Sequence, residues 1–291
     1  MQSLRSNLLY NKGKSYGPFL LSSSPNIAEL LAGIGYSHIV VDMEHAPNDI
    51  STTLSMLRAI DSTARGKCSV QNDNFPIVRV PSHNDVAMTK QILDILRPPA
   101  GIMFPMIETV QQAEAAIAST RYAPHYKNGI RGCAYPFVRA SEYGKNTEYF
   151  HVDSNQELLS IVQVETKKGI DNIPDIGMVD GVDVIFLGPF DISCDINQMG
   201  QFEPDGDVVQ LVRHAEQLVR ETRQKKREQK GIDVCLGGFR VPGRSLEEMF
   251  SEDVGYQFVS GSIDLGLLKD AALSDYQSGQ DAITHPTNKR Q

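Results

Sequence analysis

Residues Asp183 to Asp191 read D-V-I-F-L-G-P-F-D, which is an apolar run followed by a Gly-Pro turn and an acidic side chain. A short, continuous apolar run bounded by turn residues is typical of a strand buried on both faces. The stretch His38–Asp42 (H-I-V-V-D) repeats this pattern nearer the start of the chain. Strands covered by helices on both faces belong to parallel sheets, so these two stretches favour an α/β fold.

The alternation of such runs with helical segments extends along the whole chain. Strands are expected at Pro18–Ser22, His38–Asp42, Ile77–Val80, Gly101–Pro105, Leu158–Glu165, Asp183–Gly188, Val234–Gly238 and Gln257–Gly261. Amphipathic helices are expected at Asn26–Ala32, Ser51–Ile60, Asp85–Leu96, Thr109–Thr120, Thr166–Ile176, Asp207–Glu228, Ser245–Ser251 and Ile263–Leu273. About eight strand–helix units in 291 residues predict a (β/α)8 TIM barrel, with a doubly wound open sheet as the alternative.

The predicted organisation is one barrel domain over residues 1–276, beginning with a short N-terminal helix, and a disordered tail over residues 277–291. Two segments look inserted: a polar loop at Ser62–Pro76, and a charge-rich part of a long helix at Arg220–Lys230. The charge-rich part is expected to be a solvated helix face, with a basic binding patch as the alternative.

Composition excludes several classes of protein. The chain has 28 Lys and Arg residues against 36 Asp and Glu, a net charge of -8, which argues against nucleic-acid binding. No apolar stretch approaches the ~20 residues needed to cross a bilayer. The 4 cysteines form no C-x-x-C pair, so neither a disulfide framework nor a structural zinc site is expected. Reduced thiols and the absence of a secretory segment indicate a cytoplasmic protein.

Polar side chains gather where four of the predicted strands end. They are Asp42, Glu44 and His45 after the second strand, Arg79 in the third, Gln163 and Glu165 in the fifth, and Asp191 after the sixth. Each alone has an ordinary structural explanation, such as a loop histidine, half of an ion pair or a helix-capping carboxylate. The catalytic residues of a barrel come from the carboxyl ends of its strands, so their coincidence at one rim predicts a site.

These residue types suit metal-assisted chemistry. Glu165 and Asp191 supply two protein oxygens, which suits a Mg²⁺-like ion that keeps waters and takes further ligands from the substrate. A substrate with adjacent carboxylate and keto oxygens would complete the shell, and the ion would stabilise an enolate as a Lewis acid. Arg79 could add positive charge at the same oxygen, and His45 could move a proton near neutral pH.

Six motifs, in this order and spacing, resemble a known family over Leu4–Ala272. They are S-S-S-P-N-I-A-E-L-L-A-G-I-G-Y, V-D-M-E-H-A-P-N-D, V-R-V-P-S-H-N-D, G-I-R-G, V-Q-V-E-T and L-G-P-F-D-I-S. The chain resembles the metal-dependent class II pyruvate aldolases of the HpcH/HpaI family, which cleave 4-hydroxy-2-oxoacids such as 4-hydroxy-2-oxoheptanedioate.

The resemblance implies a barrel of the phosphoenolpyruvate/pyruvate superfamily, with the last helix exchanged between paired subunits in a dimer-based homo-oligomer, often a hexamer. It implies a divalent metal, Mg²⁺, Mn²⁺ or Co²⁺, on Glu165 and Asp191. The implied catalytic residues are His45 as acid/base, Arg79 on the enolate, Asp42 beside them and Asp94 supporting the histidine. The implied substrate pocket consists of Arg79, Gln163, Gly188 and Pro189, and we add Phe190 because it lies between Pro189 and Asp191.

Two departures from the family pattern concern the substrate. The chain has no Trp, whereas relatives commonly have one near the first strand, and Phe190 stands where a small residue is usual. The motifs V-R-V-P-S-H-N-D and D-M-E-H are about as close to macrophomate synthase, a relative that decarboxylates oxaloacetate and passes the enolate to a pyrone.

The expected function is therefore a divalent-metal-dependent carbon–carbon lyase that works through a pyruvate enolate and cleaves a 4-hydroxy-2-oxoacid to pyruvate and an aldehyde. The alternative is an oxaloacetate decarboxylase or enolate-addition synthase with the same site. A barrel without catalysis, used for binding or assembly, is the third hypothesis. The expected partners are a small oxoacid substrate and further copies of the chain.

Overall fold

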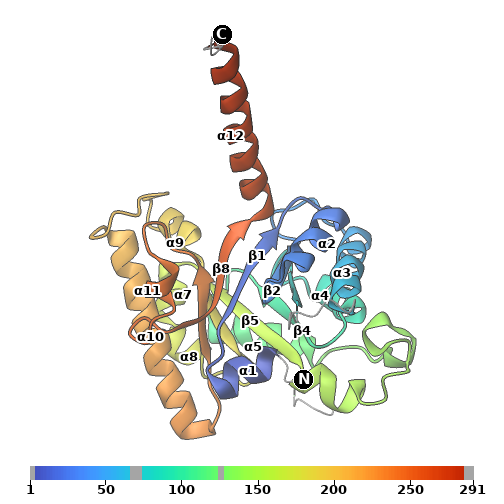
Figure 1. The fold of residues 1–291 in the computed structure, drawn as a ribbon. Helices are drawn as coiled ribbons and strands as arrows, with labels where there is room; N and C mark the ends of the chain where they lie inside the picture. The colour runs from blue at the N-terminus through green and yellow to red at the C-terminus, as the bar shows by residue number, and fades with distance from the viewer. Residues whose placement is uncertain (1–3, 66–73, 124–127, 285–291) are drawn as a thin grey trace.

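A computed structural model describes residues 4–65, 74–123 and 128–284, and their strands form a closed parallel barrel (Figure 1). The strands are β1 (Ser15–Leu20), β2 (His38–Asp42), β3 (Phe75–Arg79), β4 (Ala100–Phe104), β5 (Leu158–Val164), β6 (Val184–Leu187), β7 (Cys235–Phe239) and β8 (Tyr256–Ile263). Each strand pairs with the next along the chain, and β1 pairs with β8. This closure confirms the predicted TIM barrel and excludes the open sheet.

The connecting segments are largely helical and cover the outside of the barrel. The helices are α1 (Leu4–Asn11), α2 (Pro25–Ile34), α3 (Ile50–Arg65), α4 (Val86–Ile95), α5 (Val110–Thr120), α6 (Ser154–Gln156), α7 (Lys167–Asp171), α8 (Ile173–Ile176), α9 (Pro189–Asp195), α10 (Asp207–Lys230), α11 (Leu246–Met249) and α12 (Asp264–Thr284). Short helical turns η1 (Tyr135–Phe137), η2 (Arg139–Ser141) and η3 (Tyr149–Asp153) precede β5.

Helix boundaries follow local capping chemistry. The Ser24 side chain accepts a hydrogen bond from the Ile27 N–H at the start of α2, and Gly35 ends that helix with a φ of 101°. Thr109 and Gln112 form a capping box at the start of α5. The single helix expected over 166–176 is instead two short helices, because Asn172 ends α7 and precedes α8.

The first strand begins earlier than predicted, at Ser15 rather than Pro18. Its register with β8 shifts between Gly17 and Pro18. A proline lacks the N–H that a regular ladder needs, and such an irregularity accommodates it within a strand. The proline therefore lies inside the strand rather than at its start.

The barrel interior is filled by side chains. An aromatic plug, defined here as Phe19, Phe186 and Phe239, has ring centroids 4.7–6.2 Å apart. The helix α1 covers the amino ends of the strands, where Leu8 is fully buried and its carbonyl accepts a hydrogen bond from the Gln257 side chain. The barrel is therefore a packed core that leaves the carboxyl ends of its strands as the place for a site.

Two segments differ from the sequence predictions. Residues 62–65 belong to α3 and residues 75–76 to β3, and the remainder of the expected loop at Ser62–Pro76 lies largely outside the described residues. Residues 277–284 continue α12 as helix, so the disorder expected there is wrong, and 285–291 lie outside the described residues. Figure 1 shows α12 projecting from the barrel.

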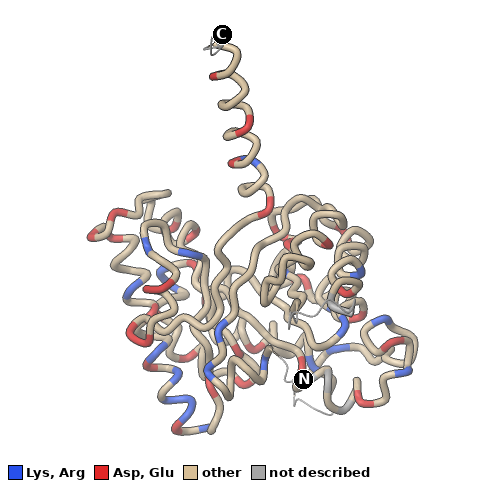
Figure 2. The backbone as a smooth tube through the Cα atoms, viewed as in Figure 1, with Lys and Arg blue, Asp and Glu red and all other residues tan. Residues whose placement is uncertain are grey.

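The charge-rich part of α10 is more than a solvated face, although Figure 2 shows its basic residues spread along the end of the helix. Lys226 is fully buried and donates hydrogen bonds to the carbonyls of Val179 and Val182, 3.3 and 2.8 Å away. Arg227 forms an ion pair with Asp233. The expectation of a solvated face is therefore wrong for Lys226, whereas Arg227 is exposed as expected and pairs with Asp233 just before β7.

Within the described ranges, no helix combines the length and the apolar character that crossing a membrane requires.

Candidate active site

The centre of the site is an ion pair between the last residues of two neighbouring strands. Asp42 ends β2, Arg79 ends β3, and the two are register partners. The guanidinium donates from Nε to Asp42 Oδ1 at 2.8 Å and from Nη2 to Oδ2 at 2.6 Å. Both side chains are buried, and the two-point contact fixes the plane of the guanidinium.

The third nitrogen of Arg79 faces the interior of the rim. Its Nη1 lies 2.8 Å from Glu44 Oε2 and 3.5 Å from Gln163 Oε1. The guanidinium carbon stands 5.0 Å from the centre of the Phe19 ring, so the cation rests on the aromatic plug. Arg79 therefore joins β2, β3 and β5 at one level and presents a fixed positive charge there.

The carboxylate of Glu165 lies next to the arginine cluster, defined here as Arg79 and its contacts Asp42, Glu44 and Gln163. The Gln163 amide donates to Glu165 Oε2 at 3.1 Å, and the Met106 N–H donates to Oε1 at 2.8 Å. Glu165 is only 2% exposed. Burial, followed by repulsion from the Asp191 carboxylate, raises the pKa of Glu165 to about 8. The site therefore holds a buried carboxyl group that no cation contacts among the described residues, and its ionised form is disfavoured.

The turn after β6 makes room for this carboxylate. A β-carbon on Gly188 would lie 2.4 Å from Glu165 Oε2, a separation that side-chain carbons do not adopt. Pro189 begins α9, and Asp191 lies in its first turn. Asp191 acts electrostatically on both Glu165 and Glu44, so three carboxylates share one side of the site.

His45 lies at the solvent edge of the site. Its side chain is 58% exposed, and its Nε2 is 3.8 Å from Glu44 Oε2. Glu44 therefore stands between His45 and Arg79, and burial raises the pKa of that glutamate. The structure brings His45 to the same rim as the other candidates, with a ring free to meet a molecule that enters from solvent.

Asp94 and Phe190 lie apart from the contacts of Arg79. Asp94 lies in the last turn of α4, 3.5 Å from the Arg131 guanidinium. Because α4 runs back toward the amino ends of the strands, the structure does not bring Asp94 to His45 within one chain. The Phe190 side chain is 48% exposed and packs edge-on against Phe202, with ring centroids 5.1 Å apart. It is neither a core residue nor in contact with the arginine cluster.

The residues present fit a divalent ion that keeps solvent or substrate ligands. Among the described residues, no three His, Cys, Asp or Glu side chains are grouped to hold an ion by themselves. Glu165 and Asp191 supply two hard oxygen donors, and the space beside Glu165 depends on the missing side chain of Gly188. A cation there would stabilise the ionised form of Glu165, whose pKa is raised by burial and then by repulsion from Asp191.

Two contacts are absent from the residue set predicted from sequence. The sequence places Glu44 at the crowded exit of the second strand, and the structure adds that it forms an ion pair with the third nitrogen of Arg79. The sequence signal for this contact is the position of Glu44 two residues after Asp42, which puts it at the same strand exit as Asp42. Met106 contributes through its backbone N–H, with a left-handed φ of 55°, and its side-chain type gives no sign of that role.

Comparison with known proteins matches the model of the HpcH/HpaI aldolase/citrate lyase family to residues 15–270. The chain belongs to this family. The hydroxypyruvate/pyruvate aldolase of Chromohalobacter salexigens is 34% identical over 259 residues, covering 89% of this chain and 90% of that protein. The 4-hydroxy-2-oxo-heptane-1,7-dioate aldolase of Escherichia coli is 34% identical over 256 residues, with coverages of 88% and 87%.

Solved structures agree with membership of the HpcH/HpaI family. A family protein from Burkholderia cenocepacia J2315 is 30% identical, with a TM-score of 0.81, and the match covers 96% of this chain and 100% of that one. Macrophomate synthase, at 21% identity and a TM-score of 0.75, shares the fold over 97% of this chain and 91% of its own. The resemblance inferred from sequence is thereby confirmed, and this HpcH/HpaI family member is an aldolase-type carbon–carbon lyase.

Proposed function

We propose that the chain cleaves a 4-hydroxy-2-oxoacid to pyruvate and an aldehyde, with a divalent ion, Mg²⁺ or Mn²⁺, held by Glu165 and Asp191. The observation that carries the proposal is the fixed position of Arg79 beside the Gln163–Glu165 pair, at 3.5 Å from the Gln163 amide oxygen. Retro-aldol cleavage leaves an enolate on the pyruvyl fragment. A site for it needs fixed positive charge at the enolate oxygen.

The roles of the chain's own residues follow from their surroundings. Asp42 holds the Arg79 guanidinium on two sides, so the cation stays oriented toward the developing enolate without rearranging. The Gln163 amide links Arg79 to Glu165 and borders the pyruvyl group. Gly188 and Pro189 give the substrate carboxylate access beside Glu165. A bound divalent ion would supply Lewis-acid polarisation of the 2-keto oxygen.

His45 is the proposed base for the 4-hydroxyl proton. Its exposed ring lies at the rim, beyond the buried arginine cluster, where the aldehyde part of a substrate would stand. Glu44 Oε2 lies 3.8 Å from the ring Nε2, next to the group that would take the proton. Decarboxylation of oxaloacetate requires no base at this position, so the same site would also support that reaction.

We also propose that the chain forms a homo-oligomer in which α12 packs against another copy. The helix is held to the barrel at its first residue, where Asp264 accepts hydrogen bonds from the N–H groups of Leu21 and Ser22. Beyond that residue its apolar side chains are exposed. They are Leu265, Leu267, Leu268, Leu273, Tyr276 and Ile283. So many exposed apolar residues on one projecting helix favour an interface.

The proposed function is tested by metal binding and pyruvate formation in the same preparations. Glu165→Gln and Asp191→Asn should each weaken Mn²⁺ binding, measured by calorimetry, and abolish pyruvate release from 4-hydroxy-2-oxoacids. Asp253→Asn, which changes an exposed carboxylate between α11 and β8, is the matched control and should behave as wild type. Full activity of chelator-treated, metal-free protein would refute the proposal.

A further inference from the structure

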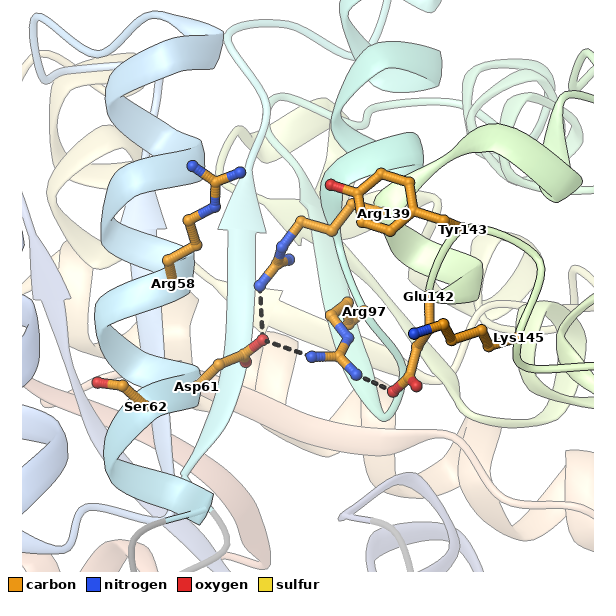
Figure 3. Close-up of a pocket in the computed structure, with 8 residues that line it drawn as sticks. All are labelled: Arg58, Asp61, Ser62, Arg97, Arg139, Glu142, Tyr143 and Lys145. Atoms are coloured by element: carbon orange, nitrogen blue, oxygen red, sulfur yellow. Dashed lines mark hydrogen bonds and ion pairs between the residues drawn. The ribbon is translucent and has the colours of Figure 1, made fainter.

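A second cavity, of about 520 Å³, lies between α3, the end of α4 and the segment around η2 (Figure 3). Its walls carry the cations Arg58, Arg97, Arg139 and Lys145 and the carboxylates Asp61 and Glu142. Since α3 and α4 run back toward the amino ends of the strands, this cavity is at the end of the barrel away from Arg79. It is therefore separate from the candidate active site.

The cavity is positively charged in a chain whose net charge is -8. Both carboxylates are already paired: Asp61 lies 2.6 Å from Arg139 and 3.7 Å from Arg97, and Glu142 is paired with Arg97. Arg58 and Lys145 form no hydrogen bond or ion pair with residues in the described ranges. Two cations on the wall therefore remain for a ligand.

Arg139 and Arg58 face the same space. Arg139 is fixed by Asp61 and by the carbonyl of Ile95, at the end of α4. Burial lowers the pKa of Arg139, the Asp61 carboxylate offsets part of this effect, and the nearby charge of Arg58 adds to the lowering. Figure 3 shows both guanidinium groups, with the Tyr143 hydroxyl, bordering one open region. An anion between these donors would remove the repulsion between the two guanidinium groups.

The backbone that shapes this wall is strained. Glu142 and Tyr143 are consecutive non-glycine residues with φ values of 55° and 58°, in the left-handed region. They are held there by hydrogen bonds from the Glu142 N–H to the Arg139 carbonyl and from the Tyr143 N–H to the Val138 carbonyl, both 2.9 Å. Strain of this kind persists where the surroundings enforce it, and it gathers at ligand sites.

We propose that this cavity binds a small phosphate monoester, with its dianionic phosphate between Arg58 and Arg139. A phosphate monoester concentrates close to two negative charges and several acceptor oxygens in one group, which matches a wall that carries two more cations than carboxylates. The planar guanidinium fork binds such oxygens in pairs. The Tyr143 hydroxyl adds a donor, and Lys145 adds charge at the same wall. This inference does not depend on the proposed reaction.

Calorimetry with glycerol 3-phosphate, and with inorganic phosphate and succinate at equal ionic strength, tests this inference on the full chain. Wild type should bind glycerol 3-phosphate saturably in the millimolar range or tighter, and Arg58→Glu should weaken it by about tenfold or more. Arg213→Glu, the same change at an exposed position on α10, should bind as wild type.

Melting temperature and pyruvate formation should be alike in wild type and both variants, because Arg58 has no structural partner among the described residues. Binding of inorganic phosphate as well would identify the phosphate group itself as the determinant and support the site. The inference is overturned by equal binding in Arg58→Glu and Arg213→Glu, by tighter binding of succinate than of either phosphate, or by the absence of saturable binding to wild type.

Discussion

Gly188 and the carboxylate of Glu165 approach so closely that a β-carbon at residue 188 would stand 2.4 Å from Oε2. Pro189 and β6 hold the backbone on either side of Gly188. A β-carbon at residue 188 would therefore displace the Glu165 carboxylate rather than the backbone. This contact links the Gly-Pro turn directly to the proposed metal ligand.

Gly188→Ala should therefore reduce activity while leaving the fold intact. Displacing Glu165 by the width of a methyl group should lower kcat/KM by about 10²-fold, the scale of a misplaced catalytic group. Steady-state pyruvate release and thermal melting measure the two effects. Gly33→Ala is the matched control, because nothing lies within 4 Å of that added carbon in α2, and it should stabilise the protein slightly. Unchanged kcat/KM in Gly188→Ala would show that the contact has no catalytic importance.

Arg79→Ala should lose both stability and activity, for separable reasons. It leaves Asp42 buried without its partner, which costs about 3–5 kcal/mol, and it removes the charge at the enolate oxygen, which lowers turnover by about 10²-fold. Arg244→Ala breaks a different buried pair, 2.6 Å from Glu216, and should destabilise without affecting turnover per folded molecule. Equal turnover per folded molecule in both variants would make Arg79 a structural residue only.

His45→Ala should slow aldol cleavage more than oxaloacetate decarboxylation. Cleavage needs a base at the 4-hydroxyl, and general acid–base catalysis contributes about 10²–10⁴-fold. Decarboxylation needs only stabilisation of the enolate, which the buried Arg79 supplies. Both reactions can be followed by pyruvate formation with the same enzyme preparation. Equal losses in the two reactions would assign His45 to substrate positioning.

Phe190→Ala should change substrate preference with little effect on stability. The ring is 48% exposed, so its removal should cost less than about 1 kcal/mol, rather than the 3–5 kcal/mol of a core phenylalanine. Next to Asp191 at the rim, the shorter side chain should raise kcat/KM for bulky 4-hydroxy-2-oxoacids relative to small ones. Phe137→Ala, at an 82% exposed ring on η1, is the control. An unchanged ranking would remove Phe190 from substrate selection.

Because of Lys226, the free energy of unfolding should rise with pH in the alkaline range. Burial lowers its pKa to about 8, from 10.5 in the unfolded chain. Below pH 8 both states carry the proton, and the folded state bears the desolvation penalty. As pH rises toward 10.5 the folded state loses its proton first, so wild type should gain about 2–3 kcal/mol of stability relative to Lys226→Met. Urea unfolding of both proteins at several pH values measures this difference, and a pH-independent difference would contradict it.

The fold could be predicted because buried parallel strands leave a direct pattern in sequence. The apolar runs at His38–Asp42 and Asp183–Gly188 lie where β2 and β6 are found, and the turn residues after them mark the strand exits. Asp42, Arg79, Gln163 and Glu165 were placed together by the rule that strand ends meet at one rim, and the structure joins them by hydrogen bonds.

The remaining features could not be predicted because they depend on the direction of a helix, on the burial of a side chain or on a backbone contact. Asp94 is close to Arg79 in sequence, but a helix of ten residues carries it to the other end of the barrel. Lys226 lies on the buried stripe of α10, seven residues after the buried Val219, although its neighbours in the sequence are charged. The Met106 contact with Glu165 is made by a backbone N–H, so the type of side chain at residue 106 does not predict it.

The aromatic plug beneath Arg79 fills the barrel interior and closes it below the candidate active site. Packed rings fill the space below the guanidinium and α1 covers the opposite opening, so among the described residues the strand-exit rim is the side from which a molecule reaches Arg79. The groups proposed to hold pyruvate lie above these packed rings. His45 and Phe190 lie in the segments that follow β2 and β6. Directed evolution toward new aldehydes can therefore be confined to libraries of rim residues, with the enolate-forming apparatus left as it is.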